Sequence, residues 1–119
     1  HHFTADGLES PKIAEEFLVH SNAELSHADR LAERIVQLGG EPNFNPEGLV
    51  ARGHAEYDES SDLKATIRAN LIAERVAVES YRQMIALVAD KDSTTRRLLE
   101  DILVDEEEHA GELKDWLAR

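Results

Sequence analysis

The chain has 119 residues, and its 25 acidic residues against 13 Lys and Arg give a formal net charge of −12. This length fits one domain with a modest core. The charge disfavours nucleic acid and anionic membranes as partners, because both bind through clustered Lys and Arg, and it suits metal cations. The chain has no cysteine, which excludes disulfide frameworks, iron–sulfur clusters, thiolate zinc sites and cysteine nucleophiles. No secretory or membrane-spanning apolar run is found, so we expect a soluble cytoplasmic protein.

Three long segments have the apolar periodicity of α-helices. The first is expected over Pro11–Leu38, between a serine suited to the N-cap and a Gly-Gly pair that ends the helix. The second is expected over about Ser61–Ala89, and the third from Ser93 or Thr94 to Leu117. No alternation typical of β-strands occurs. The pattern predicts an all-α protein, with one domain over residues 1–119.

The two connections between these segments differ in length, which predicts the topology. The short link Asp90–Asp92 should leave the second and third helices as antiparallel neighbours. The irregular stretch Gly39–Ser60 can reach roughly 70 Å when extended, whereas the first helix is only about 42 Å long. A crossover along the bundle would therefore leave the first two helices parallel. A short helical turn is possible within it, around Leu49–His54.

Each predicted helix has an inward stripe that is apolar at its ends and polar at its centre. The stripes are Ile13, Phe17, His20, Glu24, His27, Leu31, Ile35 and Leu38 in the first helix, Ile67, Leu71, Glu74, Val78, Tyr81, Ile85 and Val88 in the second, and Leu99, Ile102, Glu106, His109, Leu113 and Trp116 in the third. Three carboxylates are thereby placed in the interior of a bundle.

Unpaired buried carboxylates cost several kcal/mol each, and the stripes hold few basic residues. Bound metal is the natural compensation, because each of the two Glu-x-x-His pairs lies one turn apart on one helix face. The candidate ligands are Glu24, His27, Glu74, Glu106 and His109. Carboxylates with one imidazole per ion suit iron or manganese better than calcium. The alternative is a bundle rotated so that these residues face water, although rotating Glu74 outward would also expose Leu71 and Val78.

On these residues the chain resembles the ferritin-like superfamily, and bacterioferritins most closely. The segment Glu24–Ile35 resembles the second bacterioferritin helix, including its His-Ala-Asp-Arg run, and Gly39–Asn43 resembles the start of the crossover. Asp105–His109 resembles the motif of the fourth helix. The resemblance implies a ferritin-like four-helix bundle with a long crossover loop, of which this chain supplies three long helices, and a di-iron centre inside it.

The resemblance also implies roles and an activity. Glu24 and Glu106 would bridge two iron ions, His27 and His109 would each hold one, and Glu74 would be a terminal ligand. The protein would be a ferroxidase that oxidises Fe(II) to Fe(III) with dioxygen or peroxide, for iron storage or detoxification. Manganese could replace iron. The implied assembly is a homo-oligomeric shell of 12 or 24 subunits, and the ligand pairs within one bundle favour the bacterioferritin arrangement.

The sequence departs from the bacterioferritin pattern in two ways. The first helix of the family, with its own Glu ligand, has no counterpart here, so we expect the chain to be a fragment with five of six ligands. His1–Thr4 would then be the last turn of that helix, and ferroxidase activity is expected only with the helix present. Bacterioferritins bind haem through a Met directly after the second-helix Glu, where this chain has Leu25, so haem is not expected.

Two other function classes stay open at this stage. One is a di-iron or di-manganese enzyme without storage, such as a peroxidase, catalase or hydroxylase, and the other is a non-catalytic helical interaction module. His20, one turn before Glu24, is either a transient iron site or, more often in such positions, a plain core histidine. Asp105, one turn before His109, is a candidate to accept the second N–H of a metal-bound imidazole.

Overall fold

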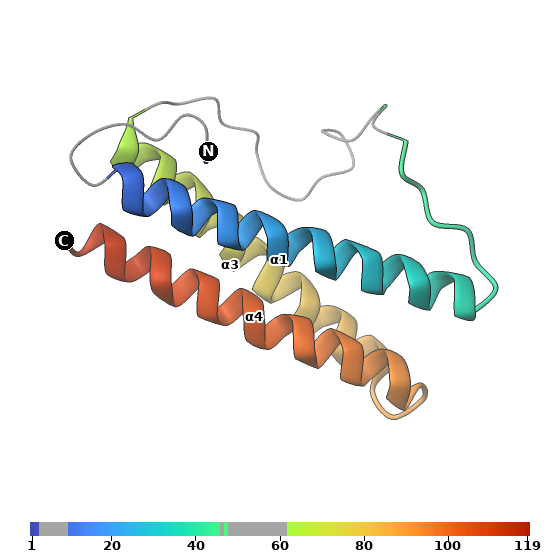
Figure 1. Cartoon of the computed structure of the whole chain (residues 1–119). Coiled ribbons are helices and arrows are strands. Elements are labelled where there is room, and N and C mark those ends of the chain that lie inside the picture. Colours follow the sequence, from blue (N-terminus) through green and yellow to red (C-terminus); the bar gives the residue numbers. More distant parts are fainter. Residues whose placement is uncertain (3–9, 46, 48–61) are drawn as a thin grey trace.

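The computed structural model describes residues 1–2, 10–45, 47 and 62–119. These residues contain three long helices and no strand. The helices are α1 (Ser10–Gln37), α3 (Leu63–Val88) and α4 (Ser93–Leu117) (Figure 1). The predicted all-α class is confirmed, and each boundary lies within about two residues of its expected place. In the described part of the chain, no helix is long and apolar enough to span a membrane. The predicted turn at Leu49–His54 lies outside the described residues.

The helix ends follow from capping interactions. The Asp62 carboxylate accepts a hydrogen bond from the Ala65 N–H at 2.8 Å and starts α3. The Asp92 carboxylate does the same for α4, with the Thr95 N–H at 3.1 Å. After α1, Gly39 adopts a φ of +85°, a left-handed conformation that glycine reaches without strain and that commonly ends helices.

The three helices have the predicted topology. In Figure 1, α3 and α4 are antiparallel and joined by a short turn, while α1 runs parallel to α3. The largest interface lies between α3 and α4, and α1 packs on α4. The Arg34 guanidinium donates from Nη2 to the Asp92 carboxylate at 2.9 and 3.1 Å and from Nε to Thr95 Oγ1 at 2.9 Å. These bonds tie the end of α1 to the start of α4.

Apolar layers lie on either side of a polar layer in the bundle. One apolar cluster consists of Ile13, Phe17, Ile67, Leu71 and Leu113, and Val78, Leu99 and Ile102 are buried on the other side. The stripes predicted for α3 and α4 are therefore buried along most of their length. The prediction for α1 was wrong at its end, because Ile35 and Leu38 are 41% and 59% exposed. No described helix covers that side of the last turns of α1.

We expect Ile13→Ala to destabilise the protein by about 2–5 kcal/mol. Ile13 is completely buried and anchors α1 in the apolar cluster, so the truncation leaves a cavity where α1 joins the other helices. Urea unfolding followed by circular dichroism measures this change. The matched control is Val19→Ala on the same helix, where the side chain is 56% exposed and the expected change is below about 0.5 kcal/mol. Equal effects of the two substitutions would show that α1 is not docked through Ile13.

Candidate metal centre

The polar layer brings four of the five predicted ligands together. One potential ligand atom from each of Glu24, Glu74, Glu106 and His109 lies within 4.8 Å of the others. Glu74, Glu106 and His109 are buried, with Glu106 only 1% exposed. The expected inward position of Glu24 is only partly realised, because 46% of its side chain is exposed. Three helices thus contribute carboxylates and one imidazole to a common point.

The distances around His109 fit a shared cation better than direct hydrogen bonds. Its Nδ1 lies 3.7 Å from Glu24 Oε1, 3.8 Å from Glu74 Oε1 and 3.9 Å from Glu106 Oε2. All three separations exceed hydrogen-bond length. Ligands that each lie about 2.1 Å from one ion are separated from one another by roughly 3–4 Å. The nitrogen and the three oxygens are therefore spaced like ligands around a common ion.

His27, the fifth predicted ligand, lies in the same polar layer but is near only two of the four clustered residues, Glu24 and Glu106. Its Nδ1 is 3.1 Å from Glu106 Oε1 and 3.7 Å from Glu24 Oε1, and its Nε2 is 2.7 Å from Asp105 Oδ2. Asp105 thus serves His27 across the helix interface, whereas the sequence suggested His109 on its own helix. Since Asp105 accepts the Nε2 hydrogen bond, Nδ1 is directed at the two glutamates. A carboxylate partner on the far nitrogen is the usual support for a metal-binding imidazole.

The proximity of these groups redistributes their protons. Burial, together with the facing carboxylates of Glu74 and Glu24, raises the pKa of Glu106 to about 11. Burial opposes protonation of His109, but the carboxylates of Glu24 and Glu74 outweigh it and raise its pKa to about 10. Burial would also raise the pKa of Glu24, yet its contacts with His109, Glu106 and His27 lower it to about 2. Without a cation, the cluster therefore retains protons on Glu106 and His109 at neutral pH.

Several buried atoms of the cluster have no hydrogen-bond partner. They are Glu74 Oε2, Glu106 Oε2 and His109 Nδ1. Leaving a buried polar atom unpaired costs about 1–3 kcal/mol, so three such atoms at one point need an explanation. A bound cation would pair with all of them. Oxygen and imidazole ligands without thiolate suit iron or manganese, and the residues present therefore fit the metal that the sequence predicted.

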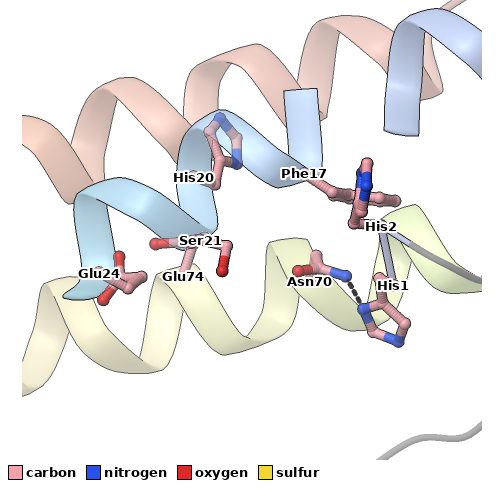
Figure 2. Close-up of a pocket in the computed structure, with 8 residues that line it drawn as sticks. All are labelled: His1, His2, Phe17, His20, Ser21, Glu24, Asn70 and Glu74. Carbon is pink, nitrogen blue, oxygen red and sulfur yellow. Dashed lines mark hydrogen bonds between the residues drawn. The ribbon is translucent and has the colours of Figure 1, made fainter. Parts of the chain in front are cut away.

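A cavity of about 270 Å³ gives access to the cluster from one side. Figure 2 shows Glu24 of α1 and Glu74 of α3 facing it from adjacent helices. The remaining lining residues are His1, His2, Phe17, His20, Ser21 and Asn70. This opening explains why Glu24 is half-exposed, whereas Glu106 does not line the cavity and is buried.

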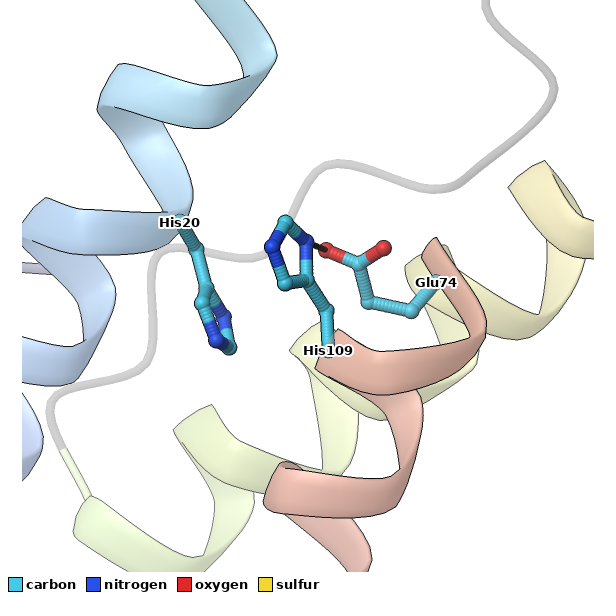
Figure 3. A group of neighbouring side chains, drawn as sticks. All are labelled: His20, Glu74 and His109. Carbon is cyan, nitrogen blue, oxygen red and sulfur yellow. Dashed lines mark ion pairs between the residues drawn. The ribbon is translucent and has the colours of Figure 1, made fainter. Parts of the chain in front are cut away.

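Sequence reasoning weighed His20 as a transient iron site but missed the neighbouring cluster that it forms with Glu16 and Glu112. Glu16 and His20 are four residues apart on α1, and Glu112 follows His109 by one turn on α4, so both relations could be read from the sequence. The sequence does not reveal that α1 and α4 bring the three residues together. His20 is buried, and its ring stacks on that of His109 with centroids 4.0 Å apart. Figure 3 shows the two histidines side by side with Glu74.

Comparison with known proteins gives a consistent result. A family model described as ferritin-like domain matches residues 1–119. The chain is 30% identical over 112 residues to a bacterioferritin of Desulfovibrio desulfuricans, and 33% identical over 108 residues to one of Mycobacterium leprae. These alignments cover 91% and 90% of the chain, but the chain spans only 57% and 64% of those two proteins.

Two further relatives extend this result. A nutrient stress-induced DNA-binding protein of Synechococcus is 31% identical over 121 residues, with 99% of this chain and 69% of the relative covered. A solved structure of a dodecameric thioferritin, the bacterioferritin-related protein of Bacteroides fragilis, superposes with a TM-score of 0.91 at 28% identity. The superposition covers 98% of this chain and 71% of the Bacteroides fragilis chain. The matched family model, the sequence relatives and the shared helical architecture show that the chain belongs to the ferritin-like family.

Proposed function

We propose that this chain is the iron-handling part of a ferritin-like protein that oxidises Fe(II) to Fe(III) for storage or detoxification. The observation that carries the proposal is the pairing pattern in the polar layer. Glu24 and Glu106 each approach both His27 and His109, within 3.1–3.9 Å. Of these two histidines, Glu74 is within ion-pair distance of His109 alone, at 3.8 Å in the described part of the chain. Two carboxylates that each lie near both imidazoles suit a pair of neighbouring cations, which shared carboxylates hold together.

The proposal gives each of these residues a role. In the proposal Glu24 and Glu106 bridge two iron ions, because shared carboxylates offset the repulsion between close cations. His109 and Glu74 bind one ion and His27 binds the other. Asp105 orients His27 by accepting its Nε2 hydrogen bond. In the described residues, no third carboxylate lies within ion-pair distance of His27 Nδ1.

Iron is the substrate of the proposed reaction. Two Fe²⁺ ions give up one electron each, and these two electrons with two protons convert dioxygen to hydrogen peroxide, or hydrogen peroxide to two water molecules. The protein supplies anionic oxygens, which stabilise Fe³⁺ over Fe²⁺, and holds both ions beside the cavity at Glu24 and Glu74. Glu106 and His109 lose their protons when the cations bind.

Storage is favoured over a di-iron or di-manganese enzyme without storage because bacterioferritins are among the relatives. We also propose a homo-oligomer, as for the dodecameric Bacteroides fragilis relative. The net charge of −12 would draw Fe²⁺ toward such an assembly. The DNA binding in the name of the Synechococcus relative is not part of the proposal, since an acidic chain repels the phosphate backbone.

Addition of Fe²⁺ to the purified protein without oxygen, followed by dioxygen or peroxide, tests the function. We expect rapid appearance of ferric absorbance, above the rate in protein-free buffer, and iron-rich particles in electron micrographs after repeated additions. Oxidation without particles would favour an enzyme that does not store iron. Absence of both iron and manganese uptake would leave the helical interaction module as the better explanation.

A further inference from the structure

The cluster of Glu16, His20 and Glu112 has the composition and spacing of a separate cation site. His20 Nε2 lies 2.7 Å from Glu112 Oε2 and 3.2 Å from Glu16 Oε1. One ligand atom from each of the three residues lies within 4.8 Å of the others. The imidazole is buried, while the two carboxylates are 26% and 39% exposed. Three ligands from α1 and α4 thus converge at a point that solvent reaches.

The protein alone leaves this cluster electrostatically unbalanced. Among the described residues, the ion pairs of Glu16 and Glu112 involve only His20, and no Lys or Arg lies within ion-pair distance of either carboxylate. A hydrogen bond to the Glu112 carboxyl group, together with burial and the charge of Glu112, raises the pKa of Glu16, so the two acidic side chains lie close together. One protonated imidazole balances a single carboxylate, whereas a divalent cation balances both.

His20 connects this cluster to the candidate metal centre. Its Nδ1 is buried without a hydrogen-bond partner, and its ring stacks on His109 at 4.0 Å. His20 also forms a group with Glu74 and His109, in which the potential ligand atoms lie within 4.8 Å of one another (Figure 3). A cation held by Glu16, His20 and Glu112 would therefore lie next to the centre.

We propose that Glu16, His20 and Glu112 form an additional binding site for a first-row divalent transition-metal cation. One imidazole and two carboxylates favour such an ion over calcium, which prefers oxygen ligands alone. The open carboxylates capture the cation, and the buried imidazole holds it beside the centre. The proposal depends on the proposed function only for naming Fe²⁺ as the natural ion.

Cobalt(II) is a suitable probe because it is not oxidised under the conditions of the titration. Crystals of the unaltered protein soaked in Co²⁺ are expected to show an anomalous difference peak among the three residues. In solution, the double variant E16Q/E112Q should bind one Co²⁺ fewer per chain, because loss of two ligands weakens the site by more than about 100-fold. The matched control is E15Q/E108Q, which changes the same charge at exposed positions of the same helices and should bind as the unaltered protein does.

The proposal is overturned if the soaked crystals show no peak at the cluster, or if E16Q/E112Q and the control bind equal amounts of Co²⁺. Glu106→Ala separates this result from the proposed function. A Co²⁺ ion that stays at Glu16, His20 and Glu112 in that variant shows an independent site. If the cluster binds Co²⁺ but the unaltered protein oxidises no Fe²⁺, the proposed function fails and the additional site stands.

Discussion

Replacing Glu106 by alanine is expected to abolish cation binding at the candidate metal centre and, with it, accelerated Fe²⁺ oxidation. Glu106 is the least exposed carboxylate of the centre and approaches both histidines, at 3.1 Å from His27 and 3.9 Å from His109. In the proposed arrangement it binds both ions, so its loss weakens both. Changes to residues behind the ligands of a metal site cost about 10–100-fold in affinity, and loss of a bridging ligand should cost more than about 100-fold.

Isothermal titration with Mn²⁺ measures the affinity, and stopped-flow absorbance measures the oxidation of Fe²⁺. The matched control is Glu108→Ala, two residues away on the same helix with an exposed side chain, for which both quantities should stay within about threefold. Thermal unfolding of the metal-free variants establishes that each is folded. A Glu106→Ala protein that is folded and binds Mn²⁺ within tenfold of the unaltered protein would contradict the proposed centre.

The helical fold could be predicted because its signals are local. Asp62 and Asp92 cap helices whose start is readable from the sequence, and the interior stripes of α3 and α4 follow the helical period. The central position of Glu74 also follows from this period, since Leu71 and Val78 on either side are buried with it. Local spacing therefore determined which face of each of these two helices is buried.

Features that depend on how α1 sits against α4 could not be predicted. Asp105 pairs with His27 across 78 sequence positions, and Glu112 reaches His20 across 92. The rotation and offset of one helix against another are set by tertiary packing, which no spacing within a single helix reveals. The exposure of the Glu24 side chain also depends on tertiary packing. It results from the cavity between α1 and α3, which the spacing of residues along α1 does not reveal.

Metal affinity of the centre is expected to rise steeply with pH. The pKa values of about 11 for Glu106 and about 10 for His109 mean that both groups are protonated at neutral pH in the metal-free protein. Both must lose their proton to become ligands, so cation binding releases about two protons. Below the lower pKa, raising the pH by one unit then increases the affinity by up to about 100-fold, and the dependence flattens once the pH exceeds both values.

Titrations with Mn²⁺ between about pH 6 and about pH 8, in buffers of different ionisation enthalpy, measure both the slope and the number of protons released. Tyr81→Phe is the control. Burial, followed by the charges of the three glutamates of the centre, raises the pKa of Tyr81 to about 12. Its hydroxyl therefore stays protonated, and removing this hydroxyl should not change the number of protons released on Mn²⁺ binding. An affinity that is flat over this range would mean that Glu106 and His109 are already deprotonated without a cation. The buried carboxylates of Glu74 and Glu106 would then carry uncompensated negative charge, and the stability of the metal-free bundle should not depend on the protonation of Glu106 and His109 over this range.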